Sequence, residues 1–340
     1  ESTSYYQVTY DATGLLTSIT DIRNHREVLD TTLGGNVLTL YEDRPLDYDN
    51  WNIDVDYPEK AKQLQAQSVD VVENNPLFVD LAVHYAFGQS TMTQVIRLYA
   101  FSPRIDFITD VDWHERQVLL RTAFNTNIVS DSARYDIQYG NVTRATNDNT
   151  SWDQAKFETV GHKWADLSER DYGVALLNDC KYGYRVKGKQ MSLTLLKSGD
   201  YPDTTADEGQ HTFTYSLLPH EGDFITGEVE KAGEELNDPV VLLTDVDQDS
   251  LTPLFELDSE TPVALDAVKI SETGNDLIVR CHDYTGTTGT VMLKPHFKYD
   301  AVQRAHLNEQ EAEALTPDEN GNVLVNFKPY KIVTLRFTLG

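Results

Sequence analysis

Short apolar runs that alternate with polar positions dominate the sequence, and Gly, Asn and Asp residues separate them. The stretch MSLTLL, from Met191 to Leu196, has a period of two, which is typical of a strand with one buried face. Other runs rich in Val, Ile, Thr, Tyr and Phe predict strands at residues 5–10, 81–87, 95–101, 105–113, 118–124, 135–142, 173–177 and 211–217. The pattern therefore predicts an all-β fold.

The pattern changes after Pro219. Residues 227–237, GEVEKAGEELN, predict a short helix that Asp238 and Pro239 stop. Further strands are expected at residues 264–270, 276–281, 290–297, 323–327 and 331–337, and a short acidic helix at 308–315. Because 340 residues exceed the usual size of one domain, we expect a larger β domain at residues 1–225. A linker helix and a small β-sandwich would then occupy residues 226–340.

Charge and cysteine content narrow the class of protein. The chain has 28 Lys and Arg against 55 Asp and Glu, a net charge of −27, which disfavours nucleic acid and anionic membranes as partners. Cys180 and Cys281 are too few for a disulfide framework, and with the scattered acidic charge they predict a cytoplasmic location. No apolar stretch is long enough to span a membrane. The opening residues do not resemble a signal peptide, and we expect Glu1 to lie inside a longer protein.

Two motif matches have structural alternatives that we favour. Residues 183–190, GYRVKGKQ, have the glycine and lysine spacing of a phosphate-binding loop, but Gln190 replaces the hydroxyl residue, and a β-hairpin fits better. Asp245, Asp247, Asp249 and Glu256 match carboxylate positions of a calcium loop. Ser250 stands where that loop needs Gly and Pro253 interrupts it, so a solvated acidic turn is favoured.

Other sequence signals of chemistry are weak. Asn141 and Asn149 begin glycosylation sequons, which matter only in a secreted eukaryotic protein. No helical His pair with a Glu between, and no Gly-x-Ser-x-Gly turn, is present. We therefore assign no catalytic residue and no metal ligand.

Polar and aromatic residues follow directly after the apolar run at residues 174–177. Mixed hydrogen-bonding groups and aromatic faces are typical of sugar sites, and a polar turn between two strands is the alternative. The candidate substrate-binding residues are Asn178, Asp179, Lys181, Tyr182 and Tyr184, followed by Tyr201 and Asp203.

Several long segments carry a family resemblance. They are DYGVALLNDCKYGY at 171–184, YPDTTADEGQHTFTYSLLPH at 201–220, VDWHERQVLLRTAF at 111–124, YEDRPLDYDNWNID at 41–54 and ARYDIQYGNVTRATNDNTSWDQAKFE at 133–158. Together they resemble the carboxy-terminal region of glycoside hydrolase family 38, the α-mannosidases. The resemblance is strongest to the branch with cytosolic and vacuolar eukaryotic enzymes and many bacterial ones, and it spans essentially the whole chain.

The resemblance implies a galactose-mutarotase-like β-supersandwich followed by a smaller β-sandwich. It also implies a retaining α-mannosidase that acts on α-mannoside glycans. The family holds zinc and a nucleophilic Asp in an amino-terminal α/β barrel, followed by a helical bundle, and those motifs are absent from this sequence. Zinc is therefore expected in the full-length enzyme and not in this portion. The barrel and the bundle are the expected partners, and homo-oligomerisation stays open.

Other functions stay open as alternatives. The chain would complete the substrate cleft and stabilise the barrel, or it would be a free-standing carbohydrate-binding or mutarotase-like module. A mutarotase needs a His and a carboxylate near the sugar ring, and His114 with Asp112, or His211 with Glu208, are the available pairs. An adhesion or scaffold module is a third class.

Overall fold

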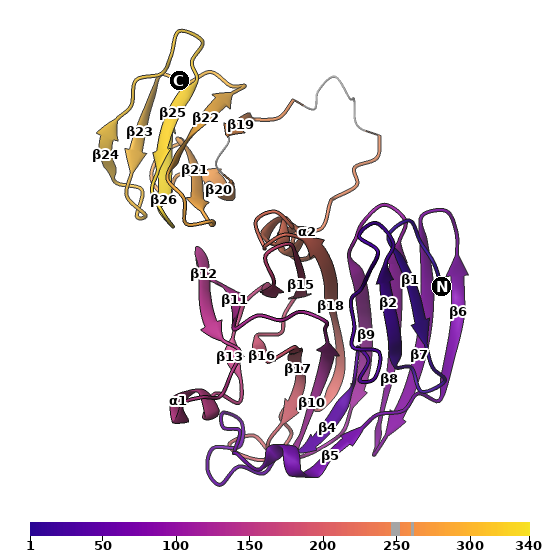
Figure 1. Ribbon diagram of the computed structural model, residues 1–340. Coiled ribbons are helices and arrows are strands. Elements are labelled where there is room, and N and C mark those ends of the chain that lie inside the picture. Colours follow the sequence, from indigo (N-terminus) through magenta and orange to yellow (C-terminus); the bar gives the residue numbers. More distant parts are fainter. Residues whose placement is uncertain (246–251, 260–261) are drawn as a thin grey trace. The chain divides into compact units, whose positions relative to one another are not determined.

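The computed structural model describes residues 1–245, 252–259 and 262–340. Contacts between residues divide it into two compact units. The first comprises Glu1–Asp136 and Val142–Pro239, and the second comprises Ile137–Asn141 and Val240–Gly340. Strands are the main regular secondary structure of both units (Figure 1), which confirms the all-β prediction.

The first unit is built from antiparallel sheets. A nine-stranded sheet has the order β12-β11-β14-β15-β18-β9-β8-β7-β6, a six-stranded sheet the order β13-β16-β17-β10-β4-β5, and β1-β2-β3 form a small third sheet. The strands of the nine-stranded sheet are β6 Ser68–Asn74, β7 Phe78–Phe87, β8 Ser90–Tyr99, β9 Ile105–Trp113, β11 Ser132–Ile137, β12 Gly140–Ala145, β14 Trp164–Ser168, β15 Tyr172–Asn178 and β18 Gly209–Glu221. The others are β1 Tyr6–Tyr10, β2 Leu16–Asp21, β3 Arg26–Glu27, β4 Thr39–Glu42, β5 Ala61–Gln63, β10 Val118–Asn125, β13 Thr159–Val160, β16 Gly183–Lys187 and β17 Gln190–Ser198.

One apolar core joins the two large sheets. Phe107 of β9 and Phe124 of β10 meet edge to face at 5.3 Å between ring centroids, and Tyr215 of β18 stacks on Phe107 at 4.9 Å. Leu193 of β17 belongs to the same buried cluster. Because side chains alternate along a strand, each sheet turns one face to this core, as expected for a β-supersandwich.

A β-bulge interrupts the regular pairing of β10 with β17 in the six-stranded sheet. Leu120 pairs with Leu196 and Arg121 pairs with Thr194, so Leu195 is the extra residue on β17. A bulge changes the direction of the side chains that follow it. Leu120 lies in the core cluster, whereas the Arg121 side chain bonds to groups outside that cluster.

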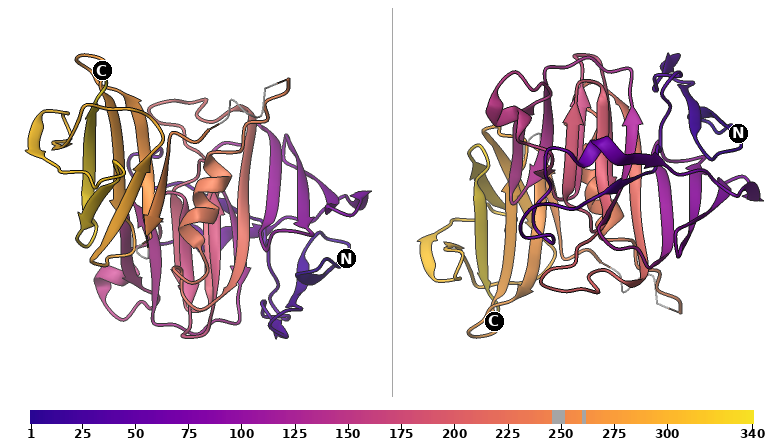
Figure 2. Two further views of the ribbon diagram at one scale, coloured as in Figure 1. Left: turned by 90° about the horizontal axis from the view of Figure 1, so that it is seen from above. Right: turned by 90° about the horizontal axis from the view of Figure 1, so that it is seen from below.

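The helix α2, Val229–Asn237, confirms the helix predicted at 227–237. It lies against β14 and β15 of the first unit (Figure 2). Trp164 of β14 donates its indole N–H to Glu230 of α2 at 2.7 Å and stacks on Phe224 at 5.4 Å. The helix thus packs with the first unit, and the domain boundary expected at residue 225 stays a prediction.

The second unit is a small β-sandwich, as predicted. One sheet has the order β20-β21-β26-β23-β24 and the other the order β19-β22-β25. Val279, Val291, Leu335 and Phe337 belong to its core. The strands are β19 Phe255–Ser259, β20 Val263–Ile270, β21 Leu277–Asp283, β22 Gly289–Pro295, β23 Ala301–Ala305, β24 Glu311–Ala314, β25 Val323–Phe327 and β26 Ile332–Thr338.

Two predictions of local structure were wrong. Residues 308–315 form no helix; they contain strand β24, which pairs with β23. Residues 135–142 are not one strand, because a turn at Tyr139, with a φ of 55°, separates β11 from β12. None of the helices in the described part of the chain has the length and apolar composition needed to cross a membrane.

Candidate functional site

The outer face of the six-stranded sheet carries a buried polar cluster. Tyr184 of β16 and Leu193 of β17 point into the core, so the residues next to them in each strand face outward. Arg121, Arg185 and Thr194 lie on this outer face. Segments outside the sheet's central strands then supply Tyr57, from the short 3₁₀ helix η1 Tyr57–Lys60, and Glu158, just before β13.

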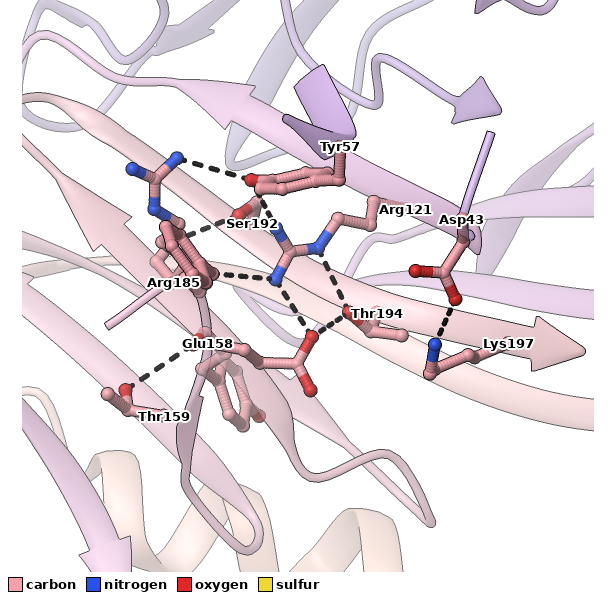
Figure 3. A network of polar contacts seen from close by, with 11 residues as sticks. Asp43, Tyr57, Arg121, Glu158, Thr159, Arg185, Ser192, Thr194 and Lys197 are labelled. Atoms are coloured by element: carbon pink, nitrogen blue, oxygen red, sulfur yellow. Dashed lines mark hydrogen bonds and ion pairs between the residues drawn. The ribbon is translucent and has the colours of Figure 1, made fainter. Parts of the chain in front are cut away.

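The Arg121 guanidinium is the centre of this cluster (Figure 3). It is 2% exposed and donates from Nε to the Thr194 hydroxyl at 2.9 Å and from Nη1 to the Tyr57 hydroxyl at 3.0 Å. Nη2 donates to Glu158 Oε2 at 2.9 Å and to the Phe157 carbonyl at 3.4 Å. A charged hydrogen-bonded pair of this kind fixes the carboxylate in one orientation. Glu158 Oε2 also accepts a hydrogen bond from Thr194.

A second buried ion pair lies at the edge of this face. Lys197 of β17 donates to Asp43, which follows β4. Burial is the main cause that raises the pKa of Asp43, and the Lys197 ammonium opposes it. The segment that leaves β4 is thereby held against the end of β17, and the loop that follows begins from a fixed position.

An open cavity of about 400 Å³ adjoins Glu158. Its lining includes two exposed aromatic side chains, Trp51 at 68% and Tyr182 at 55% exposure. Phe157, Glu158 and Gly183 also line it. We call this feature the Trp51 cavity. It combines aromatic surface with a fixed carboxylate, which is a mixture typical of sites for polar organic ligands.

The loop that carries Trp51 is braced by its own hydrogen bonds. The amides of Trp51 and Asn52 donate to the Tyr48 carbonyl at 2.8 and 3.0 Å, and the Tyr48 ring meets Trp51 edge-on at 6.4 Å. Tyr48 has a φ of 59°, which is unusual for a residue other than Gly. Asp54 closes the loop by accepting from the Leu46 amide at 2.8 Å.

Two of the predicted substrate-binding residues are interior. Asn178 is 1% exposed and Tyr184 is 0% exposed. Asn178 donates to the His162 carbonyl at 2.7 Å and accepts from the Lys181 amide at 2.6 Å. The Tyr184 hydroxyl accepts from Asn178 and donates to the Leu176 carbonyl at 3.1 Å, and burial raises the Tyr184 pKa. Both residues hold the loop after β15 in place.

Two more of these residues are partly buried in the same loop. Asp179 accepts from the Thr214 amide at 2.8 Å through Oδ2. Its Oδ1 is buried without a hydrogen-bond partner among the described residues. The Lys181 ammonium lies 4.4 Å from the centre of the Phe213 ring, and burial lowers the pKa of Lys181.

The remaining three face outward. Tyr182 lines the Trp51 cavity, with its ring against His162 at 5.7 Å. Tyr201 is 61% exposed, and its carbonyl accepts from the Asn50 amide at 3.3 Å, beside Trp51. Asp203 is exposed, and hydrogen bonds from the backbone and side chain of Thr205 lower its pKa. A sugar-binding role for the seven residues stays a prediction.

Sequence reasoning did not single out the residues that build this site. Trp51, Arg121 and Glu158 lie inside the segments that carry the family resemblance, yet none of them has a role that the sequence predicts. The available signal was Arg121 itself, a charge in the middle of the apolar run VLLRTAF. A strand arginine of this kind needs a partner when it is buried.

The other motif predictions have mixed outcomes. Residues 183–190 form the β16–β17 hairpin, with Gly188 at a φ of 56°, which confirms the hairpin. Of the calcium-loop positions, Asp247, Asp249 and Ser250 lie outside the described residues. Within the described ranges, no three His, Cys, Asp or Glu side chains are grouped as metal ligands would be.

One of the two histidine–carboxylate pairs is formed. His114 Nε2 lies 2.8 Å from Asp112 Oδ1, and its Nδ1 lies 3.6 Å from Glu208 Oε1. His211 does not pair with Glu208, because its Nε2 bonds to the Asp207 carbonyl at 2.6 Å. The structure thus places one imidazole between two carboxylates at the ends of β9 and β18.

Comparison with known proteins identifies the family. The model "Glycosyl hydrolases family 38 C-terminal domain" matches residues 2–205, and "Glycosyl hydrolases family 38 C-terminal beta sandwich domain" matches residues 262–335. Alpha-mannosidase G of Dictyostelium discoideum is 36% identical over 98% of this chain and 32% of its own length. Human alpha-mannosidase 2C1 is 33% identical over 98% of this chain and 33% of its own length.

A solved structure shares the fold. An alpha-mannosidase from Enterococcus faecalis V583 superposes with a TM-score of 0.80 at 18% identity, over 99% of this chain and 42% of that one. The present chain spans about a third of the length of the curated relatives it matches. It belongs to glycosyl hydrolase family 38 and corresponds to that family's C-terminal domain followed by its C-terminal β-sandwich domain.

Proposed function

We propose that this chain is the carboxy-terminal portion of a retaining α-mannosidase that hydrolyses α-mannoside glycans. The observation that carries the proposal is the 36% and 33% identity, over 98% of the chain, to relatives named α-mannosidases. The role of this portion is to complete the substrate cleft and to stabilise an amino-terminal catalytic barrel and helical bundle.

The chemistry of bond cleavage belongs to the amino-terminal part. Retaining hydrolysis needs a carboxylate nucleophile and an acid/base carboxyl, and the family adds zinc. The described residues of this chain offer no group of three metal-ligating side chains, so they do not fit a zinc site. What the chain supplies is a shaped surface, namely the outer face of the six-stranded sheet with the Trp51 cavity.

The cellular setting is part of the proposal. Cys180 is exposed and Cys281 is buried, and the two are not bonded to each other. Burial raises the pKa of both thiols, to about 11 for Cys180 and about 12 for Cys281, so neither is an activated nucleophile at neutral pH. The two unbonded cysteines and the net charge of −27 support a cytoplasmic enzyme.

The test compares two proteins in the hydrolysis of p-nitrophenyl α-D-mannopyranoside with zinc or cobalt added. One is the 340-residue chain, and the other is the same chain preceded by the amino-terminal part of a family member. We expect release of p-nitrophenol only from the longer protein. Release of p-nitrophenol by the shorter chain at a comparable rate would refute the proposal that bond cleavage belongs to the amino-terminal part.

A specific observation supports the mutarotase-like alternative. His114 lies between Asp112 and Glu208, and a His with a carboxylate is the acid/base pair that ring opening needs. Polarimetry of freshly dissolved α-D-mannose with the chain distinguishes the two functions. Under the proposed function the rate equals that of buffer alone, whereas an increase that His114→Ala abolishes would favour the alternative.

A further inference from the structure

We infer that the Trp51 cavity is a binding site for one neutral pyranose ring and that this chain binds the sugar there without the barrel. The inference rests on the proposed function only for the choice of mannose as the sugar. It depends on three features of the described residues: two braced aromatic walls, a carboxylate with one oxygen free, and a glycine that leaves room beside it.

The aromatic walls suit the apolar face of a sugar. Pyranose rings present C–H groups on one side, and Trp and Tyr rings provide flat apolar surface at little cost in side-chain entropy. Trp51 and Tyr182 line the same cavity. Each is held by a second ring, Trp51 by Tyr48 at 6.4 Å and Tyr182 by His162 at 5.7 Å. Exposed aromatic rings that are held in this way are preorganised for a ligand.

Glu158 supplies the hydrogen-bond acceptor. Its Oε2 is used by Arg121 and Thr194, while Oε1 has no hydrogen bond within the part of the chain that the structure describes. Figure 3 shows this second oxygen pointing away from Arg121. The buried Arg121 guanidinium fixes the carboxylate, so Oε1 is available to accept from a sugar hydroxyl.

Gly183 makes the position of this oxygen possible. A Cβ at residue 183 would lie 2.1 Å from Glu158 Oε1, far inside van der Waals contact. Gly183 lies between Tyr182 and the buried Tyr184 and lines the cavity itself. The aromatic wall, the small residue and the carboxylate therefore form one continuous surface.

Size and charge select the ligand class. A volume of about 400 Å³ lies near the lower end of small-molecule sites, which run from about 300 to 1,000 Å³, and it accommodates a single ring in an open cleft. A carboxylate as the acceptor disfavours phosphorylated sugars through charge repulsion. The net charge of −27 acts in the same direction. The site therefore fits a neutral pyranoside with adjacent hydroxyls.

The experiment uses the 340-residue chain with Trp152→Phe. Trp152 is 83% exposed, whereas Trp113 and Trp164 are 0% exposed, so Trp51 is then the exposed tryptophan that acrylamide quenches. Titration with methyl α-D-mannopyranoside should protect Trp51 from quenching, with a dissociation constant of about 1–10 mM for one ring with few hydrogen bonds.

Three variants in this background test the residues. Tyr182→Ala and Gly183→Ala should abolish the protection, and Glu158→Gln should weaken binding about tenfold by replacing a charged acceptor. Urea unfolding followed by the buried tryptophans shows whether each variant is folded. As a control, Trp51→Phe with Trp152 retained should show no protection of the exposed tryptophan.

Unchanged quenching of Trp51 at about 100 mM sugar, roughly tenfold above the upper end of the expected range of the dissociation constant, would overturn the inference. The inference would also be overturned if the sugar still protected Trp51 from quenching in both Tyr182→Ala and Gly183→Ala. Neither result touches the proposed function, which fails if the longer protein does not hydrolyse the mannoside or if the shorter chain hydrolyses it at a comparable rate. The two claims therefore fail separately.

Discussion

The ion pair between Arg121 and Glu158 should govern the stability of the first unit. Arg121 is 2% exposed and the Glu158 side chain is 27% exposed, so both charges are largely removed from water. Replacing Arg121 with Met keeps much of the side-chain volume but removes the donors to Glu158, Thr194 and Tyr57. The Glu158 carboxylate is then left without its cation.

The expected loss in the free energy of unfolding follows from these contacts. Breaking a buried ion pair by removing one partner costs about 3–5 kcal/mol, and the partial exposure of Glu158 places Arg121→Met near 3 kcal/mol. Glu158→Gln keeps an acceptor and should cost about 1–2 kcal/mol. In the double variant no buried charge is left without its partner. Its loss in free energy of unfolding should therefore be smaller than the sum of the two single losses by about 1.5 kcal/mol.

Urea unfolding followed by tryptophan fluorescence measures this directly. The four tryptophans, Trp51, Trp113, Trp152 and Trp164, all lie in the first unit, so the signal reports that unit. Lys187→Met on β16 is the control, because the Lys187 side chain in its ion pair with Asp148 is 48% exposed, against 3% for Arg121, and its loss should change stability by less than about 0.5 kcal/mol. A coupling energy below about 0.5 kcal/mol between Arg121 and Glu158 would refute the reasoning.

Three further predictions use the same unfolding assay, with circular dichroism added for the second unit. Burial raises the pKa of Glu230 to about 7 from 4.5, so the stabilising effect of its protonated form is full below about pH 4.5 and lost as pH rises through 7. The stability of Glu230→Gln, which keeps an acceptor for Trp164, should therefore rise relative to that of the wild type by about 3 kcal/mol as the pH increases from 4.5 to 8.5; a pH-independent difference would contradict this. Asn178→Ala leaves buried polar groups without hydrogen-bond partners and should lower the free energy of unfolding by about 2 kcal/mol. A change near zero would contradict the interior role of Asn178. Leu335→Ala should destabilise the second unit by about 2–5 kcal/mol and leave the tryptophan transition unchanged, whereas a shift of that transition would show coupled unfolding.

Much of the fold could be predicted because strand patterns are local. The alternation at Met191–Leu196 appears in β17 as predicted, and residues 105–113 and 323–327 match β9 and β25. The exception at 308–315 has a physical cause. The sequence NEQEAEAL favours a helix by propensity, but pairing with β23 decides its structure, and such long-range pairing is not visible in a local window.

The candidate site was less predictable because burial depends on distant segments. Asn178 and Tyr182 look equally suited to a sugar in the sequence. In the structure Asn178 pairs with Tyr215 across β15 and β18 and is enclosed, whereas Tyr182 lies beyond the strand and is exposed. Glu158 joins Arg121 from 37 residues away along the chain, and nothing in either local sequence indicates that contact.

One NMR titration tests the central claim, that this chain contacts the mannoside but does not cleave it. Methyl α-D-mannopyranoside is added to ¹⁵N-labelled chain, and the indole N–H signals and the anomeric proton of the glycoside are followed in the same sample, with Trp51 assigned by Trp51→Phe. We predict that the Trp51 indole signal shifts with saturation, that Trp113 and Trp164 stay in place, and that no free mannose forms with zinc present. Release of mannose by this chain, or an unchanged Trp51 signal at saturating sugar, would contradict the account.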